Sequence, residues 1–146
     1  MTTAIHRRVD LLRAGEDPTF IARLASGWAV LGNPQVLPGY CLLLPDPVVP
    51  TLNALAGAER AAFLADMAAL GDAVLAVTRA VRINYAVFGN LDPALHAHVI
   101  PRYHDEPESL RTAQPWAYNW EAAPAFDPER HRDLGNRIHA ALARIA

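Results

Sequence analysis

One long stretch with helical periodicity, residues 58–81, lies between two groups of short strand-like segments, and it restricts the possible folds most. Apolar residues in this stretch recur at steps of three and four: Phe63, Met67, Leu70, Val74, Val77 and Val81. Such spacing predicts a single amphipathic helix that packs on something flat. The strands on either side of it can supply that surface.

The strand-like segments are short and are bounded by Gly, Pro and Asn. They span residues 20–24, 27–31, 40–44, 83–88 and 95–100. Turn signals at Gly32-Asn33-Pro34, Pro38-Gly39 and Gly89-Asn90 connect neighbouring segments over short distances, which favours antiparallel pairing. We therefore predict an α+β fold: an antiparallel sheet of about five strands with helices packed on it.

A second helix is predicted at the C-terminal end of the chain. Asp127 is a good N-cap, Pro128 suits the first helical position, and Glu129 lies near the positive end of the helix dipole. The expected buried stripe is Leu134, Ile138, Leu142 and Ile145. A shorter helix is expected over residues 5–14, ending near Gly15.

Length and charge exclude several classes of function. The 146 residues fit one compact domain, 1–146, and 52% of them are hydrophobic, as in globular chains. The net charge is −2 and no basic run occurs, so we expect no polymeric nucleic acid as a partner. All 13 basic residues are arginines, which excludes a lysine nucleophile and a phosphate-loop lysine.

The apolar segments also bear on where the protein works. The single cysteine, Cys41, lies in an apolar run, and we interpret it as a buried structural thiol in a reducing compartment. No apolar stretch has the length of a signal peptide or a membrane span. We expect a cytoplasmic protein with no membrane partner.

The segment before Arg102 holds the densest chemical signal. On a strand over residues 95–100, side chains alternate between faces, so His96 and His98 project on the same side, with Ala94 in the same row. Two adjacent imidazoles are unusual in a purely structural strand, because each needs a partner and each resists protonation beside the other. The pair therefore indicates a functional centre.

Two chemistries fit such a pair. A neutral imidazole can attack phosphorus when its far nitrogen donates to a fixed acceptor, which the strand backbone can supply, and the nucleophile then needs no metal or other cofactor. Alternatively, His-x-His on a strand can present two metal ligands. A metal site would need further ligands nearby and a fold made mostly of strands, whereas residues 58–81 predict a helix.

The run from Leu95 to Arg102, Leu-His-Ala-His-Val-Ile-Pro-Arg, resembles the signature of the histidine triad (HIT) superfamily of nucleotide hydrolases and transferases. The similarity covers about residues 20–116 and includes residues 28–44 as the nucleotide-binding hairpin, 58–81 as the long helix and 83–85 as the preceding strand. Residues 117–146, a loop and the C-terminal helix, lie outside it. Ala94 stands where the family has its first histidine, and Tyr40 where many members have another.

The resemblance implies roles for individual residues. His96 would be the nucleophile that forms a nucleotidyl intermediate, and His98 would hold phosphate and orient His96. Asn90, in a loop shorter than the family's glycine-rich one, would bind phosphate in part. Asn33 resembles the ribose-binding position or simply tolerates a turn. Asn84 would reach the ligand or close a buried hydrogen bond, and Arg102 would steer phosphate or be solvated.

The expected function is cleavage of a phosphoanhydride or phosphoramidate of a purine mononucleotide or dinucleoside polyphosphate; the alternative is a nucleotide-binding protein with little turnover. The resemblance also implies a homodimer.

The proline-rich segment 105–127 carries Trp116, Tyr118 and Trp120, which should cover either the active-site mouth or a partner subunit. The remaining histidines of this part of the chain are expected at the surface: His104, His131 and His139.

Overall fold

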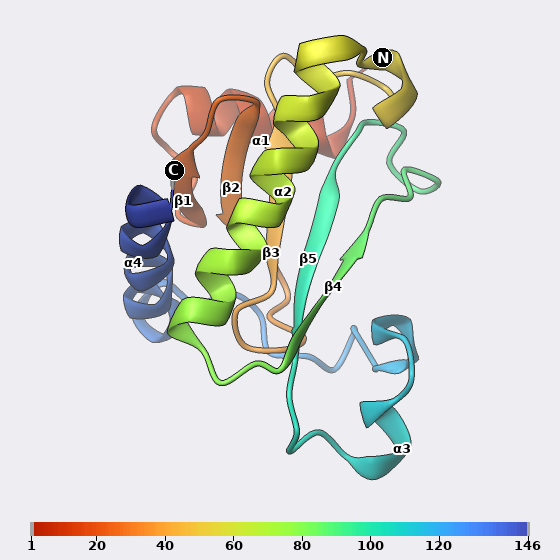
Figure 1. Ribbon diagram of the computed structural model, residues 1–146, viewed down its shortest axis with the longest axis vertical. Helices are drawn as coiled ribbons and strands as arrows, with labels where there is room; N and C mark the ends of the chain where they lie inside the picture. Colours follow the sequence, from red (N-terminus) through yellow and green to blue (C-terminus); the bar gives the residue numbers. More distant parts are fainter. Residues whose placement is uncertain (1, 146) are drawn as a thin grey trace.

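A five-stranded antiparallel sheet forms the centre of the molecule in the computed structural model, which describes residues 2–145 (Figure 1). Its strands are β1 (Phe20–Arg23), β2 (Gly27–Leu31), β3 (Cys41–Pro45), β4 (Arg82–Ala86) and β5 (Ala97–Arg102). Their order across the sheet is β1-β2-β3-β5-β4, and every neighbouring pair is antiparallel. The predicted α+β class is confirmed, and β4 is an edge strand.

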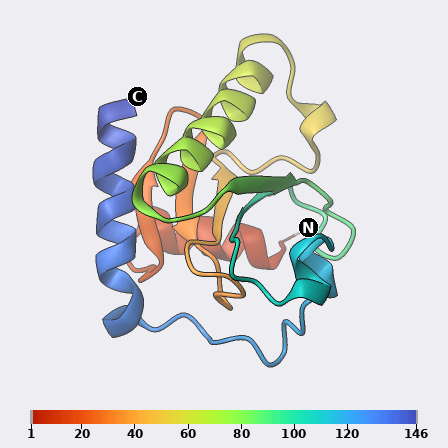
Figure 2. The same cartoon turned by 60° about the horizontal axis from the view of Figure 1, so that its bottom comes forward.

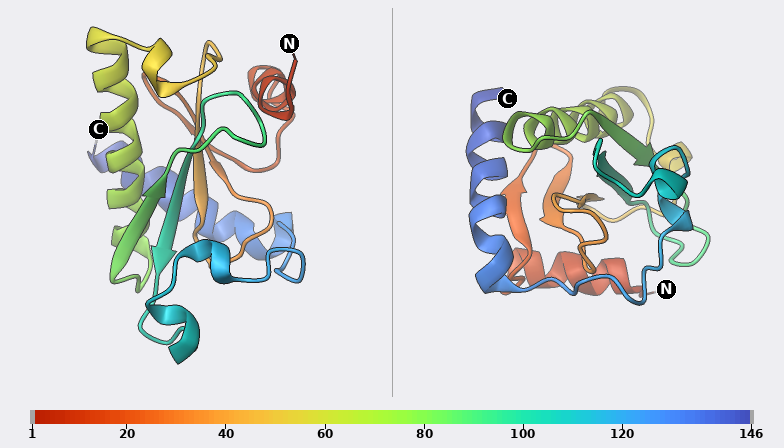
Figure 3. Two further views of the ribbon diagram at one scale, coloured as in Figure 1. Left: turned by 90° about the vertical axis from the view of Figure 1, so that its right-hand side faces the viewer. Right: turned by 90° about the horizontal axis from the view of Figure 1, so that it is seen from below.

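The helices lie on both faces of the sheet. They are α1 (Ala4–Arg13), α2 (Gly57–Val77), the short α3 (Glu108–Arg111) and α4 (Pro128–Ile145), with single 3-10 turns at Leu52–Ala54 and Pro115–Ala117. Figure 3 shows the sheet between α2 on one side and α1 on the other, with α4 along the flank next to β1. The predicted arrangement of a long helix and a C-terminal helix packed on a sheet is confirmed.

Alternation along the strands divides the core into two clusters. Ala97 and Val99 of β5 face α2, where they pack with Phe63, Leu70 and Val74. Ile100 faces the other way, in a cluster that includes residues of α1 and the even-numbered residues of β3. Cys41 is fully buried in the first cluster, as predicted, and burial raises the pKa of its thiol. His98, which alternates with Ala97 and Val99 along β5, therefore projects from the same face of the sheet as Ile100, the face that α1 covers.

The predicted end of the long helix was wrong by four residues. The helix stops at Val77 because Thr78 takes an extended conformation, while its N–H and its hydroxyl both donate to the Val74 carbonyl. Val81 fits the helical period but is 49% exposed, and its N–H donates to the carbonyl of Arg102 as the chain enters β4. A long-range strand contact thus decides where α2 ends.

The C-terminal helix begins where the sequence predicts. Pro128 is its first residue, and the Asp127 carboxylate accepts a hydrogen bond of 3.0 Å from the Glu129 N–H. Ile138 and Leu142 are buried and Leu134 packs against the core, but Ile145 is 42% exposed in the last turn of the helix, so the predicted buried stripe was one residue too long. Figure 2 shows the segment between α3 and α4 crossing the open end of the molecule.

Candidate active site

The two histidines of the predicted pair lie side by side. The ring centroids of His96 and His98 are 5.1 Å apart, their planes are inclined by 70°, and both residues are partly exposed. His96 stands immediately before β5 and not inside it, because the Leu95 N–H donates to the carbonyl of Val49 (2.8 Å) and leaves the sheet ladder. The predicted start of the strand was therefore two residues too early, but the shared side of the two rings is confirmed.

The ring of His96 is oriented by its own backbone. Its Nδ1 lies 2.7 Å from the carbonyl oxygen of Ala94. A carbonyl only accepts, so Nδ1 carries the proton and donates, and Nε2 keeps its lone pair. A neutral imidazole needs this protonation state, with the lone pair on Nε2, to attack phosphorus.

His98 is held by Tyr40, the residue that follows Pro38-Gly39. The Tyr40 hydroxyl lies 2.8 Å from Nδ1 of His98, and the two rings are nearly parallel with centroids 6.0 Å apart. Burial, and then the neighbouring His96, lower the pKa of His98 to about 4. Tyr40 is itself buried, which raises the pKa of its hydroxyl. At neutral pH both groups are uncharged.

Aromatic side chains from two other segments cover His98. We call Phe88, Trp116 and Trp120 the aromatic roof. The Trp116 ring centroid is 5.2 Å from those of His98 and Phe88, and Trp116 stacks on Trp120 at 5.1 Å. Trp120 in turn meets the edge of Tyr40. The sequence predicted that these tryptophans cover either the active-site mouth or a partner subunit. In the structure they lie over the surroundings of the histidine pair.

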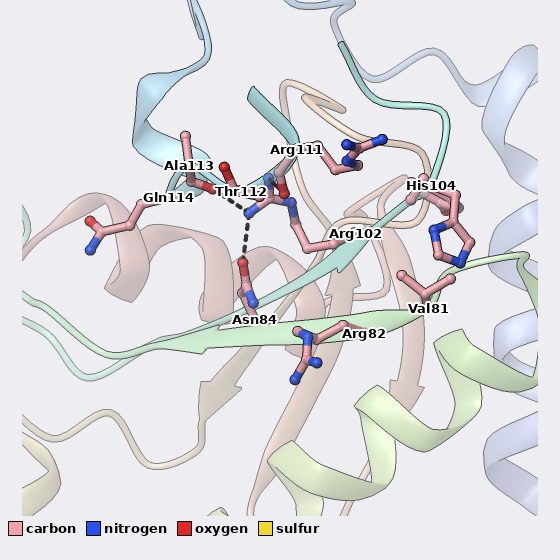
Figure 4. Close-up of a pocket in the computed structure, with 10 residues that line it drawn as sticks. Val81, Arg82, Asn84, Arg102, His104, Arg111, Thr112, Ala113 and Gln114 are labelled. Atoms are coloured by element: carbon pink, nitrogen blue, oxygen red, sulfur yellow. Dashed lines mark hydrogen bonds between the residues drawn. The ribbon is translucent and has the colours of Figure 1, made fainter. Parts of the chain in front are cut away.

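Arg102 fastens the segment that carries the roof to the sheet. Its Nε donates to the Glu106 carboxylate at 3.1 Å, and its Nη2 donates to the same carboxylate (2.9 Å) and to the Leu110 carbonyl (2.8 Å). Its Nη1 donates to Asn84 Oδ1 (2.8 Å) and the Ala113 carbonyl (2.7 Å), as Figure 4 shows. Since a guanidinium has five N–H donors, none remains for phosphate. The solvated position that the sequence allowed is also wrong, because Arg102 is 6% exposed.

Glu106 completes this cluster and was not predicted. Its carboxylate also accepts hydrogen bonds from the Tyr103 N–H and from the Tyr118 hydroxyl, which lies between the two tryptophans in sequence. Burial opposes its ionisation, but the hydrogen bonds from Arg102, Tyr118 and Tyr103 outweigh it, so the pKa of Glu106 lies below its ordinary value. A buried ion pair therefore sets the position of the loop that forms the roof.

The three candidate asparagines lie in different places. Asn84 closes the buried hydrogen bond with Arg102, which was the second of the two predicted roles. The Asn33 side chain accepts a hydrogen bond of 3.0 Å from the Phe126 N–H and so ties the hairpin to the segment before α4. Asn90 is exposed in the loop between β4 and β5. No hydrogen bond within residues 2–145 joins any of them to His96 or His98.

Ala94, in the same row as the two histidines, packs in the core. Ala94 is fully buried in the cluster that includes Ile5 and Val9 of α1. Just before it, an Asp92 oxygen accepts a hydrogen bond of 3.1 Å from the Ile5 N–H at the start of α1. The loop that leads into His96 is thus anchored on α1 and not by a third imidazole.

Open space adjoins the aromatic roof. A cavity of about 510 Å³ is lined by Phe88 and Trp116, both of which contact His98, and by Asn84, Ile100 and Gln114 further along the same face. Neither His96 nor His98 lines this cavity, which is large enough for a small ligand; the histidine pair is connected to it through Phe88 and Trp116. His104 and His139 are exposed as predicted, and His131 is half-buried, with its ring stacked on Phe126.

Within residues 2–145, no group of three or more His, Cys, Asp and Glu side chains could hold a metal ion. In the same part of the chain, no helix is long and apolar enough to cross a membrane.

Known structures share this architecture. No protein-family model and no curated protein matches the chain. A histidine triad (HIT) protein from Sinorhizobium meliloti is similar over 92% of this chain and 94% of its own, with 22% identity and a TM-score of 0.71. A histidine triad protein from Marinobacter aquaeolei matches over 87% and 90%, respectively, with 20% identity and a TM-score of 0.74.

A third similar structure is that of a hypothetical histidine triad nucleotide-binding protein from Sulfolobus tokodaii. It covers 94% of this chain and 92% of its own, with 14% identity and a TM-score of 0.74. These likenesses extend over nearly the whole chain, beyond the residues 20–116 for which the sequence showed a resemblance. The chain has the histidine triad fold.

Proposed function

We propose that the protein is a nucleotide-binding enzyme of the histidine triad type, in which Nε2 of His96 attacks the α-phosphorus of a nucleoside phosphate. The hydrogen bond between His96 Nδ1 and the Ala94 carbonyl carries this proposal, because it leaves the lone pair on the outward nitrogen. The fold that the chain shares with a nucleotide-binding protein supports it.

The reaction has two displacements at phosphorus. In the first, a bond forms between Nε2 and phosphorus, the bond from phosphorus to the oxygen or nitrogen of the leaving group breaks, and the leaving group takes a proton from solvent. In the second, a water oxygen bonds to phosphorus and gives up one proton to solvent, the phosphorus–nitrogen bond breaks, and a nucleoside monophosphate leaves while His96 is restored. His98 is uncharged at neutral pH and donates its ring N–H to a phosphate oxygen, with Tyr40 fixing the ring. No cofactor takes part in either step.

The fold and the surface around the histidines support our proposal for the substrate class. We propose a purine mononucleotide derivative or a dinucleoside polyphosphate, cleaved at a phosphoanhydride or phosphoramidate bond. The exposed rings of Phe88 (54%) and Trp116 (37%) beside His98 offer faces on which a base can stack. Asn90, exposed in the loop six residues before His96, is the asparagine nearest to the pair in sequence and would bind a phosphate oxygen.

The test compares the full chain with a His96→Ala variant on diadenosine polyphosphates and adenosine phosphoramidates. Turnover should fall at least a thousandfold in the variant, whereas a His139→Ala variant, which changes an exposed histidine of α4 outside both cavities, should keep it. Equal turnover in the His96 variant would remove this residue from the mechanism.

A second candidate function is nucleotide binding with little or no turnover. Two features favour it. Ala94 cannot hydrogen-bond to phosphate through its side chain, and all five N–H donors of Arg102 are already used within the protein, so neither residue can stabilise charge on the phosphate. Calorimetry distinguishes the two functions: tight AMP binding with no product from any of these substrates would establish the second one.

We also propose a two-fold dimer formed through α2 and β4. The sheet leaves β4 unpaired on one side, and apolar side chains are exposed along these two elements: Leu64 and Leu75 on α2, and Tyr85 on β4. Sedimentation should show a species of twice 15.9 kDa. A single species of 15.9 kDa would contradict the dimer.

A further inference from the structure

A second cavity lies on the same face of the sheet, at the end of β5 remote from the histidines. It has a volume of about 410 Å³ and contains three arginines, Arg82, Arg102 and Arg111, with His104 beside them and no acidic residue in its lining. Figure 4 shows Arg111 and His104 on the same side of the Arg102 side chain, whereas the Arg82 side chain runs from β4 in the direction away from Arg102. The chain as a whole has a net charge of −2, so this cavity is a local concentration of positive charge.

The positive charge of this cavity is only partly balanced. Glu106 neutralises Arg102, but no ion pair or side-chain hydrogen bond within residues 2–145 engages Arg82 or Arg111. Arg82 is the cross-strand partner of Arg102, but its guanidinium is directed away from that of Arg102, and no ion pair within residues 2–145 holds it there. An anion would supply the counter-charge that Arg82 and Arg111 lack.

The cavity is also built to hold a ligand with several acceptor oxygens. Its base is fixed, because Arg102 is tied to Asn84 on β4 and to the carbonyls of residues 110 and 113. The side chains of Thr112 and Gln114 line it as uncharged hydrogen-bonding groups. Arginine forks beside such groups suit the oxygens of phosphate in particular.

This cavity is separate from the proposed reaction centre. Arg102 follows His98 by four residues on β5, a span of about 13 Å at roughly 3.3 Å per residue. A phosphate group bound among the arginines therefore cannot be the one that His96 attacks. The cavity next to the aromatic roof shares Arg82, Asn84 and Gln114 with it, so the two cavities adjoin, and we call this pair of cavities the groove.

We infer that the arginine cavity is a second anion site, which binds a phosphate or pyrophosphate group through Arg82 and Arg111. The site does not depend on the catalytic role of His96. It takes either a free inorganic phosphate species or a phosphate carried by a larger molecule that lies along the groove.

The test is calorimetric titration of the full chain, and of a His96→Ala variant, with inorganic pyrophosphate and with ATP. Both proteins should bind pyrophosphate at a site that Arg111→Gln or Arg82→Gln weakens about tenfold each. Arg132→Gln, an exposed arginine on α4 outside the cavity, is the matched control and should leave the affinity unchanged. Stronger weakening of ATP than of pyrophosphate by Arg111→Gln would identify a phosphate carried by a larger molecule as the ligand.

Two results would overturn the inference: no saturable pyrophosphate binding, or binding that both arginine variants retain in full. Because Arg82 and Arg111 are exposed, their substitution should not disturb folding, which thermal unfolding of each variant checks. The His96→Ala arm separates this inference from the proposed function, since turnover can be lost there while pyrophosphate binding persists.

Discussion

Substitution of Glu106 by Gln tests the buried ion pair that holds the aromatic roof. Glutamine keeps the shape of the side chain but removes its charge, and leaves Arg102 as a buried cation without a counter-ion. The side chains of Arg102 and Glu106 are 8% and 2% exposed, so solvent cannot replace the lost carboxylate.

The expected loss of stability is large for one substitution. Removing one partner of a buried ion pair costs about 3–5 kcal/mol, and the carbonyl acceptors that remain around Arg102 place this case near 3 kcal/mol. For a chain of this size, that lowers Tm by roughly 6–12 °C. Because the folded-state pKa of Glu106 lies below its ordinary value of 4.5, its contribution is present above that pH and is lost as the pH falls through the folded-state pKa.

Urea unfolding at pH 7, followed by tryptophan fluorescence, measures the effect. Glu108→Gln is the matched control, because Glu108 is exposed two residues further on and forms no ion pair within residues 2–145. A loss below 1 kcal/mol in Glu106→Gln, or an equal loss in Glu108→Gln, would refute the account of this cluster. The emission of the folded variant should also change, since the Tyr118 hydroxyl, which lies between Trp116 and Trp120 in sequence, loses its charged acceptor.

Three further predictions concern other parts of the molecule. NMR titration of His98 should give a midpoint near pH 4, and a midpoint near 6.5 would contradict the account of its burial. Because the folded-state pKa lies below the ordinary 6.5, the free energy of unfolding should rise by at most about 3 kcal/mol between pH 4 and pH 6.5. Tyr40→Phe leaves Nδ1 of His98 without its partner and should lower the free energy of unfolding by about 1–2 kcal/mol; no change would show that the hydrogen bond contributes nothing. Asp127→Ala removes the cap on the Glu129 N–H and should cost about 1 kcal/mol in the same assay, whereas a neutral result would discount the cap.

Local patterns in the sequence predicted the features that depend on local geometry. The apolar period predicted α2 and α4, and strand alternation predicted that His96 and His98 share a side, because both follow from the backbone repeat. The end of α2 escaped prediction because Val81 continues the helical period, while its N–H pairs with Arg102 across the sheet. Sequence spacing carries no information about that long-range pairing.

The surroundings of the histidine pair depend on contacts between distant segments. Tyr40, Phe88 and Trp116 come from three separate parts of the chain, and only the aromatic density of residues 105–127 signalled that a surface had to be covered there. Arg102 was considered as a phosphate ligand or a solvated side chain because its acceptors, Glu106 among them, follow no spacing rule. Tertiary structure alone shows that all its donors are used.

The most direct test of the account is detection of a covalent nucleotide on His96. The full chain, mixed with a slowly cleaved adenosine phosphoramidate and quenched under conditions that preserve phosphorus–nitrogen bonds, should gain the mass of one nucleotidyl group, and fragmentation should locate it on His96. The same experiment on His96→Ala should show no gain. A nucleotidyl group on another residue, or turnover of the substrate by the unaltered chain with no adduct at any time, would contradict the proposed mechanism.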